Sequence, residues 1–368
     1  MPIYLDRHDT PNEITAEHVA EMHQKDLEVQ DEFGCRGFTY WFDDKRKTGF
    51  CLIEAPNKKA LEKMHHHAHG AVPSQIIEVD EELVNVFLGR LNDPEKNGKD
   101  DLIIRETAFR IIMFCQVKTS SLFNNKKSLN DLQGFNKATR HLIKRNGGSM
   151  VEKDANGILV SFVSVSKAIQ CALELQKEFM QYLGHSVDSG YHLKIGLNGG
   201  VPVTSKPQLF EDAIQLAKAF CDVGRGKIVI STEVKILADN EDLKMDTNKD
   251  LIHVLSRSEE LFLSNLSEFM EKSWQDPNLK IDDFCSHLGC SKSKFYRILT
   301  SISGKAPNSF IKDYRLEKAL NYLTEQKGNI SEIAFDSGFS SPAYFSKCFL
   351  ERYHILPSAF TKRMADPY

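Results

Sequence analysis

Histidines near the N-terminal end are the first residues whose type and spacing indicate chemistry. His65 and His69 are four residues apart, so on a helix both imidazoles lie on one face, a spacing that chelates metal ions. Imidazole nitrogens suit nickel, copper or zinc. His23, on an earlier predicted helix, supplies a third ligand if the two helices pack side by side. The alternative is a solvated histidine cluster at a helix end, where imidazolium complements the helix dipole.

A second group of residues with chemical potential lies near the C-terminal end, on the open faces of two short predicted helices. The group consists of Ser291, Lys292, Ser293, Lys294, Tyr296, Arg297, Ser341, Pro342, Ala343, Tyr344 and Lys347. The opposite faces are apolar, with Phe295 and Leu299 on the first helix and Phe345 and Phe349 on the second. A helix with one buried and one polar face is typical of an element that enters a DNA groove.

Each of these helices follows a shorter helix and a glycine turn. Gly289 and Gly338 occupy the turns, where a left-handed backbone favours glycine. Phe295 and Phe345 hold equivalent places 50 residues apart, which indicates an internal duplication. A connecting helix that begins at Pro307 can set the two exposed helices about one DNA turn apart, roughly 34 Å.

This C-terminal segment resembles the AraC/XylS family of transcription regulators. The matching positions are Ile333-Ala334, Gly338-Phe339-Ser340, Tyr344-Phe345-Ser346, Phe349 and Pro357-Ser358-Ala359-Phe360. The resemblance implies an all-α domain with two helix-turn-helix units over residues 258–368. It also implies binding to double-stranded promoter or operator DNA, as a homodimer, with RNA polymerase as a further partner.

By position in this family, base contacts come from Ser293, Tyr296 and Arg297. Arg297 is the strongest candidate because a guanidinium can pair with guanine through two hydrogen bonds. The second helix is poor in donors, so we expect it to read methyl groups and DNA shape, and to bind phosphate through Lys347. Phosphate contacts are also expected from Lys292, Lys294 and Lys305, for which the alternative is a solvated surface charge.

Bulk properties allow several domains but do not by themselves indicate a nucleic-acid binder. The 368 residues suggest two or three domains, each long enough to bury a core. The net charge is -4, and residues from 258 onward contain 14 Lys and Arg against 14 Asp and Glu. The eight cysteines are scattered without C-x-x-C spacing, and no run is long enough for a membrane span. We therefore expect reduced thiols, a cytoplasmic location and no membrane partner.

The first segment, residues 1–92, is predicted to be a small ferredoxin-like domain. Strands at 3–7, 38–42, 48–54 and 75–79 alternate with helices at 15–33 and 56–69, in the order βαββαβ. If the helices cover one face of the sheet, the other face is bare and free to pair with a second copy. Phe50 to Pro56 and His65 to Gly70 resemble a small family whose best-known member binds nickel, which implies metal or ligand sensing.

Residues 93–106 are predicted to be a linker, and residues 107–257 a second α+β domain. Its order of strands and helices resembles that of the class III nucleotide cyclases. The residues that carry the resemblance are Met113-Phe114, Gly147-Gly148, Asn156-Gly157, Leu193 to Leu197, Gly199 and Gly226 to Ser231. In that family two aspartates hold the catalytic metal ions, and they fall at Gln116 and Asn156 here. The family's transition-state residues fall near Gln215 and Ala219.

An amide is a poor ligand for Mg²⁺, and alanine cannot stabilise phosphate charge. We therefore predict that this domain is not an enzyme, and that it serves either as a dimerisation scaffold or as a pocket for a small ligand. Asp154, two residues from the expected metal position, is the residue that a shift of register would bring into use.

The complete prediction is a multidomain α+β transcription regulator in which a metal or small ligand changes DNA affinity. The first alternative is a nucleotide cyclase controlled by its flanking domains, which Gln116 and Asn156 argue against. The second alternative is a metal buffer with an attached DNA-binding domain.

Overall fold

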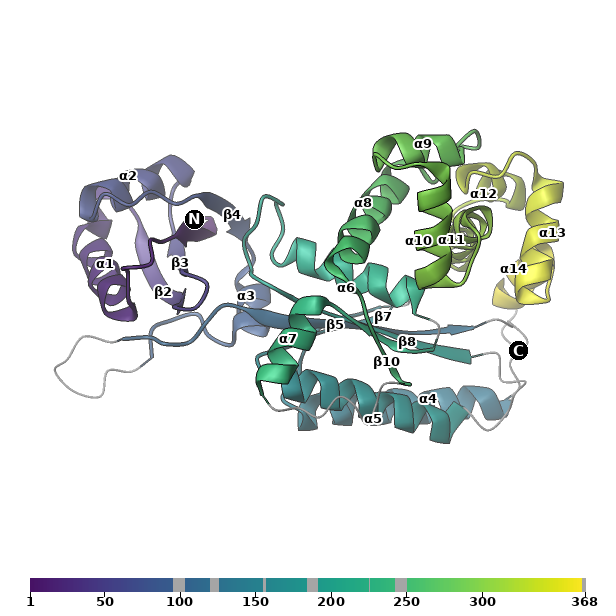
Figure 1. The fold of residues 1–368 in the computed structure, drawn as a ribbon, viewed down its shortest axis with the longest axis horizontal. Helices are drawn as coiled ribbons and strands as arrows, with labels where there is room; N and C mark the ends of the chain where they lie inside the picture. The colour runs from purple at the N-terminus through teal and green to yellow at the C-terminus, as the bar shows by residue number, and fades with distance from the viewer. Residues whose placement is uncertain are drawn as a thin grey trace.

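The computed structural model describes residues 1–94, 103–119, 126–154, 157–183, 191–224, 226–241 and 250–365. Two sheets and a helical C-terminal part follow one another along the chain (Figure 1). This is the mixed architecture that the sequence predicts, with a small N-terminal sheet, a larger middle sheet and a bundle of helices. Asn156 and most of the predicted linker lie outside the described residues.

The N-terminal domain has the predicted βαββαβ order. Its elements are β1 (Ile3–Asp9), α1 (Ala16–Val29), a 3₁₀ turn (Gln30–Phe33), β2 (Arg36–Asp43), β3 (Thr48–Glu54), α2 (Lys58–Ala68), β4 (Gln75–Val79) and α3 (Glu81–Leu88). The strands form an antiparallel sheet in the order β2-β3-β1-β4. Helix α3 was not predicted, and it changes what the sheet can do.

The second face of this sheet is not bare, contrary to the prediction. Side chains alternate along each strand, so Tyr4 and Ile53 pack under α2 while Leu5 and Trp41 point to the other face. There they join one buried cluster with Val84, Phe87 and Leu88 of α3 and with Phe210 of the middle domain. Pairing with a second copy through this face would require that the middle domain leave it.

The middle domain is a six-stranded sheet with helices on both faces. Its elements are β5 (Arg110–Thr119), α4 (Lys126–Arg145), β6 (Ser149–Asp154), β7 (Gly157–Phe162), α5 (Val165–Leu183), β8 (Tyr191–Gly200), α6 (Glu211–Val223), β9 (Ile228–Ile230), α7 (Thr232–Asn240) and β10 (Ile252–Val254). The strand order is β10-β9-β8-β5-β7-β6, with β5 antiparallel to both neighbours and β8, β9 and β10 parallel. The short elements α7 and β10 were not predicted.

Alternation along β5 distributes its side chains between two cores. Met113 and Cys115 join the core under α4 and α5, which lie below the sheet in Figure 1. Ile112 and Phe114 join the cluster that the middle domain shares with the N-terminal sheet. A nearly continuous apolar strand is what a sheet covered on both faces requires.

The C-terminal part consists of α8 (Arg257–Ser273), α9 (Ile281–His287), α10 (Lys292–Ser303), α11 (Pro307–Thr324), α12 (Ile330–Asp336), α13 (Pro342–Tyr353) and α14 (Pro357–Ala365). Two buried clusters correspond to the two predicted helix-turn-helix units, one around Phe284 and Phe295 and the other around Phe345 and Phe349. Helix α11 contributes Ile311 to the first cluster and Leu316, Ala319 and Leu323 to the second.

The first of these clusters does not stop at the predicted domain boundary. Phe220, Val223 and Val229 of the middle domain pack in it together with Phe262 and Leu266 of α8. The half-buried Lys118 ammonium lies 3.1 Å from Asp222 Oδ1 of α6 and, across the same interface, pairs with Glu317 of α11. The middle and C-terminal domains thus share both apolar core and charged contacts.

The flanks of the predicted linker are packed rather than loose. The Asp93 amide donates to Phe38 O at 3.0 Å, and the Ile104 amide donates to the Tyr40 hydroxyl at 2.9 Å. Within the described part of the chain, no helix combines the length and the apolar character needed to cross a membrane.

Candidate nucleic-acid interface and metal centre

Helices α10 and α13 each begin at a serine cap. Ser291 Oγ accepts from the Lys294 amide at 3.3 Å, and Ser341 Oγ accepts from the Tyr344 amide at 3.2 Å. Such a cap satisfies one of the amides that a helix start leaves without a partner. These two predicted site residues therefore also fix where the two exposed helices begin.

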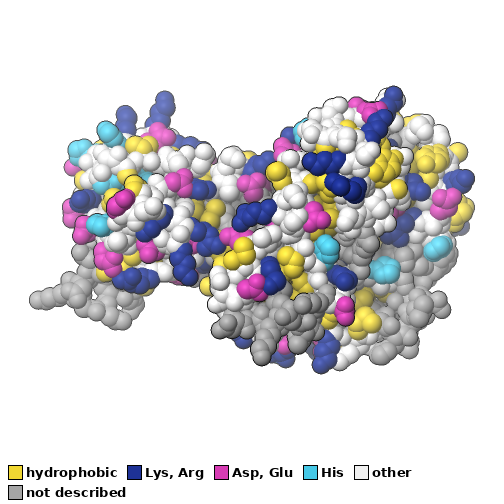
Figure 2. All heavy atoms as spheres, viewed as in Figure 1, with side chains coloured by type: hydrophobic (Ala, Val, Ile, Leu, Met, Phe, Trp, Pro, Cys, Tyr) yellow, Lys and Arg dark blue, Asp and Glu magenta, His cyan; other side chains and the backbone are white. Residues whose placement is uncertain are grey.

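Helix α10 presents the predicted residues to solvent. Lys292, Ser293, Lys294, Tyr296 and Arg297 are all exposed, while Phe295 between them is fully buried. Lys292 Nζ lies 2.7 Å from Asp282 Oδ1 of α9, and both side chains remain open to water. No ion pair or hydrogen bond engages the Arg297 guanidinium among the described residues, so it can bind an outside partner. Lys and Arg side chains gather near α9 and α10 in Figure 2.

Helix α13 has a different surface. Pro342 is half-buried, whereas Ala343, Tyr344 and Lys347 are exposed, with Tyr344 at 50%. The Tyr344 ring lies 6.1 Å from the Phe339 ring, which orients it along the helix start. One cation and an aromatic ring are suited to phosphate and apolar contacts more than to hydrogen-bonded base recognition.

Helix α11 and α8 hold the two units together. The Arg315 guanidinium donates to Trp274 O at 2.8 Å and to Asp276 O at 2.6 Å. Lys305, a predicted phosphate ligand, instead pairs with Asp313 of α11 and is only partly exposed. Lys305 therefore contributes to the connection between the units, and α10 supplies the more open cations.

Imidazoles and carboxylates form a buried cluster in the N-terminal domain. His65 is fully buried, with Nε2 2.8 Å from Asp6 Oδ2 and Nδ1 3.1 Å from Asp26 Oδ1. His69 Nε2 lies 3.2 Å from Asp26 Oδ1, so the predicted pair of histidines is brought together on α2. Asp26 comes from α1 and Asp6 from β1, and both were missed by the prediction.

His23 does not join this cluster, contrary to the prediction. Its Nε2 lies 3.1 Å from Asp93 Oδ2, and its ring lies 4.9 Å from the Tyr40 ring. Asp26 lies about one turn further along α1 than His23, and at that height it meets the histidines of α2, whereas His23 meets Asp93. The two helices pack side by side, as expected, and Asp26 is the α1 residue that reaches the histidines of α2.

The structure contains two groups of possible metal ligands, and within each group the donor atoms all lie within 4.8 Å of one another. One consists of Asp6, His8, Cys51 and His65, and the other of Asp26, His65 and His69. The alternation of Tyr4, Asp6 and His8 along β1 puts all three on the face under the helices. A charged residue on a buried strand face was the signal available in the sequence.

Electrostatics within the cluster favour a charged imidazole in the absence of metal. Burial alone would lower the pKa of His65, but the carboxylates of Asp6 and Asp26 raise it to about 10. Burial alone would raise the pKa of Asp6, but His8 and His65 hold it well below its usual value. Burial and the nearby carboxylates raise the pKa of the Cys51 thiol.

The donor chemistry fits a divalent transition metal. Imidazole, carboxylate and thiolate together are ligands for nickel or zinc. His8 Nε2 is buried, lies 3.5 Å from Asp6 Oδ1 and makes no hydrogen bond among the described residues, so it is available as a ligand. A metal would have to displace the proton of His65, which makes metal and proton competitors for this cluster.

The positions predicted to replace cyclase catalytic residues lie on or near β5 and α6. Gln116 is half-buried on β5, Gln215 Nε2 donates to Glu211 Oε1 at 2.8 Å, and Ala219 is buried. Among these three described side chains there is no carboxylate that could hold a metal ion.

Comparison with known proteins identifies two of the domains. Residues 284–363 match the model of a helix-turn-helix domain family, and residues 4–79 match that of the nickel responsive protein SCO4226-like family. Histidine kinase P4 of Formosa agariphila is 27% identical over 144 residues, 39% of this chain and 10% of that protein. The HTH-type transcriptional regulator ExsA of Pseudomonas aeruginosa is 30% identical over 108 residues, 29% of this chain and 38% of that protein. The chain thus spans well under half of either relative.

A solved structure of an adenylate/guanylate cyclase/hydrolase from Silicibacter pomeroyi is also similar. The identity is 23%, the match covers 36% of this chain and 80% of that one, and the TM-score is 0.32. A TM-score this low does not establish a shared fold, so the cyclase-like nature of the middle domain stays a prediction. The chain thus carries a helix-turn-helix domain within residues 284–363 and an SCO4226-like domain within residues 4–79.

Proposed function

We propose that this protein is a sequence-specific DNA-binding transcription regulator. The observation that carries the proposal is the AraC-type domain with two serine-capped helices. Each helix packs one face on its own buried core and exposes the other face, and α11 joins the two units. Two reading helices on one chain can enter successive major grooves on the same side of a duplex. Double-stranded promoter or operator DNA is the proposed partner.

Arg297 is the residue proposed to contribute most to base recognition. Selection from a pool of genomic fragments would provide the preferred site, and fluorescence anisotropy would then give affinities for that site and for unrelated DNA. We expect Arg297→Ala to weaken the preferred site by about 1–3 kcal/mol, roughly 5- to 150-fold, and to reduce its advantage over unrelated DNA. Lys347→Ala should weaken both DNAs alike, because phosphate contacts carry no sequence information.

Lys63→Ala is the matched control, since it removes an exposed cation from the N-terminal domain. It should leave both affinities unchanged. Selection that enriches no fragment at moderate salt would contradict the proposal, and so would an Arg297→Ala variant that keeps its full preference.

A specific observation also supports metal responsiveness. The SCO4226-like match, together with the convergence of Asp6, His8, Cys51, His65 and His69, supports a divalent transition metal as effector. The N-terminal sheet and the middle domain share one buried cluster, so a change at the metal cluster has a packed route toward the C-terminal domain. Titrating nickel, copper and zinc during DNA binding tests this: an affinity that none of the three alters would refute metal control.

We further propose that the middle domain catalyses no cyclase reaction and that the protein acts as a homodimer. Gln116 in place of a carboxylate supports the first point. Because α3 and the middle domain cover the face of the N-terminal sheet that was expected to be bare, the dimer contact is expected on another surface. Cyclic nucleotide formation from ATP or GTP with Mn²⁺ would contradict the first point, and a monomer by sedimentation with DNA present would contradict the second. Contact with RNA polymerase remains a prediction.

A further inference from the structure

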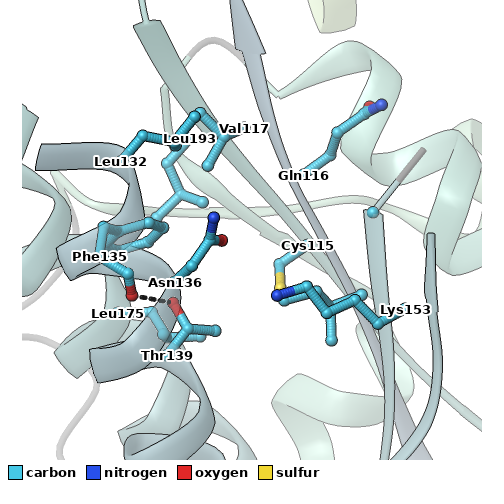
Figure 3. Close-up of a pocket in the computed structure, with 12 residues that line it drawn as sticks. Cys115, Gln116, Val117, Leu132, Phe135, Asn136, Thr139, Lys153, Leu175 and Leu193 are labelled. Carbon is cyan, nitrogen blue, oxygen red and sulfur yellow. Dashed lines mark hydrogen bonds between the residues drawn. The ribbon is translucent and has the colours of Figure 1, made fainter. Parts of the chain in front are cut away.

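A cavity lies inside the middle domain, between the sheet and the two helices that cover its lower face. Its volume is about 300 Å³. Side chains from α4, α5, β5, β6 and β8 point toward it in Figure 3, whereas Gln116 points away. Gln116, where the cyclase resemblance puts a catalytic residue, is still among the residues that border the cavity, so the cavity adjoins that position. The DNA-binding helices contribute none of the described lining residues.

The walls of this cavity are mostly apolar, with polar groups on two sides. Leu132, Phe135, Val117 and Leu193 are among the residues that form the apolar part. The polar exceptions on α4 are Asn136 and Thr139, and Thr139 Oγ1 already donates to Phe135 O at 2.9 Å. An amide and a cavity of this size give a ligand room and a group with which to hydrogen-bond.

Among the described residues that line the cavity, the charge has one sign. Lys153 on β6 is the cation among the lining residues, and those residues include no Asp or Glu. Partial burial and the nearby Arg140 guanidinium lower the pKa of Lys153, which means that two cations lie close together here. The Cys115 thiol beside Lys153 stays protonated, because burial raises its pKa. Two neighbouring cations, with no carboxylate among the described lining residues, favour an anionic group on the ligand.

The volume limits the size of the ligand. An apolar protein cavity of about 150 Å³ holds one benzene molecule. Twice that volume accommodates about ten to twelve heavy atoms, which is the size of a short fatty acid or a simple aromatic acid. A dinucleotide or a nucleoside triphosphate is too large, and it would lack enough apolar surface for these walls.

We propose that this cavity binds a small carboxylate with an apolar or aromatic body, held by Lys153 at the carboxylate and by the walls from α4 and β5 along the body. The site is additional to DNA and to the metal centre. It extends the prediction that the middle domain contains a pocket for a small ligand, because it names the residues that would bind the ligand and the chemical class of that ligand.

Isothermal titration calorimetry of the full chain with octanoate tests the site, with 1-octanol and octylamine as probes of equal length. We expect octanoate to bind at least about tenfold more tightly than either, since a charge-assisted hydrogen bond contributes about 1.5 kcal/mol. Lys153→Gln should remove that preference, and Lys177→Gln, an exposed lysine on α5, should keep it. Val117→Trp fills the cavity and should abolish binding, with the unfolding midpoint recorded to establish that the variant is folded.

Equal affinities for octanoate and octylamine would overturn the proposal. So would unchanged octanoate binding in Val117→Trp or in Lys153→Gln, or no binding of octanoate to the native protein at millimolar concentration. The titration contains no DNA, so its failure leaves the proposed regulator function standing, and failure of DNA binding leaves the cavity proposal standing.

Discussion

His65 is an imidazole that the N-terminal domain keeps fully buried between two carboxylates. Such an arrangement favours a charged ring, because a neutral ring would remove the one cation that the two buried carboxylates share. His65 therefore has two favourable states. In one, the protonated ring pairs with Asp6 and Asp26; in the other, the neutral ring ligates a metal ion.

Stability of the metal-free protein should fall in alkaline solution. The pKa of His65 is about 10 in the folded protein against an ordinary value of 6.5, so the folded state holds one more proton between these values. The stabilisation is fully present below pH 6.5 and is lost as pH rises through about 10. Urea unfolding between pH 6 and 10 measures this as a falling free energy of unfolding.

The comparison variants for this pH dependence are His65→Gln and His66→Gln. His65→Gln should cost about 3–5 kcal/mol at pH 6, from the broken buried pairs, and should flatten the alkaline decline. His66 is exposed on the same helix, so His66→Gln should behave as the native protein. An equally steep decline in His65→Gln would show that other groups cause it.

Metal affinity should depend on His8. It should also rise with pH, whereas the stability of the metal-free protein falls. His8 Nε2 makes no hydrogen bond among the described residues and is free to ligate, so His8→Gln should weaken nickel or zinc binding by about tenfold or more. Affinity should rise with pH because His65 must release its proton to the solvent. Calorimetry in buffers of different ionisation enthalpy counts that proton, and His66→Gln serves as control. Equal metal affinity in His8→Gln would exclude this donor set.

At the scale of elements, the two helix-turn-helix units share a pattern but differ in how tightly their turns are packed. Gly289 has φ +59° with open space where a Cβ would lie. Gly338 has φ +73°, and a Cβ there would lie 2.6 Å from Trp274 O and 2.8 Å from Arg315 Nε. The second turn is thus held against the C-terminal end of α8, where Arg315 binds the same carbonyl.

Alanine at these two turns should have unequal costs. Gly289→Ala meets only the backbone penalty of a left-handed residue, about 1 kcal/mol. Gly338→Ala adds a backbone clash, so we expect a further loss of about 1–3 kcal/mol and weaker DNA binding through α13. Urea unfolding and anisotropy measure both variants. Equal destabilisation would mean that the contact with Trp274 does not constrain the second turn.

For the whole molecule, the cores do not coincide with the domains that the sequence predicts. One cluster joins the N-terminal sheet to the middle domain, and another joins the middle domain to α8 and the first helix-turn-helix unit. Contacts between domains also include Arg46 with Glu233 at 2.7 Å, and Lys118 with Glu317. We expect unfolding to be cooperative across all three parts.

The two tryptophans report on the two shared cores. Trp41 is fully buried in the first and Trp274 is buried in the second. With selective excitation of tryptophan, the signal comes from Trp41 alone in Trp274→Phe and from Trp274 alone in Trp41→Phe. Each variant should unfold in urea with a fluorescence midpoint that matches its own circular dichroism midpoint. Well-separated midpoints within one variant would show that the parts unfold independently.

The sequence by itself determined most of the elements and indicated the function that we propose for the C-terminal domain. Apolar residues at helical spacing and glycines at the turns are local signals, and they predicted both helix-turn-helix units, the exposed residues of α10 and α13, and the βαββαβ order of the first domain. The pair of His65 and His69 was also predictable, because four residues along a helix fix one face.

Only the tertiary structure decided which residues from distant segments meet. It put Asp6, Asp26 and Cys51 beside His65 and took His23 away to Asp93, since the rotation of α1 against α2 depends on packing that no local pattern encodes. It covered the sheet face expected to be bare, because α3 and Phe210 bury the same apolar side chains that a second copy would have buried. Burial demands some apolar partner, and the sequence pattern does not say which one.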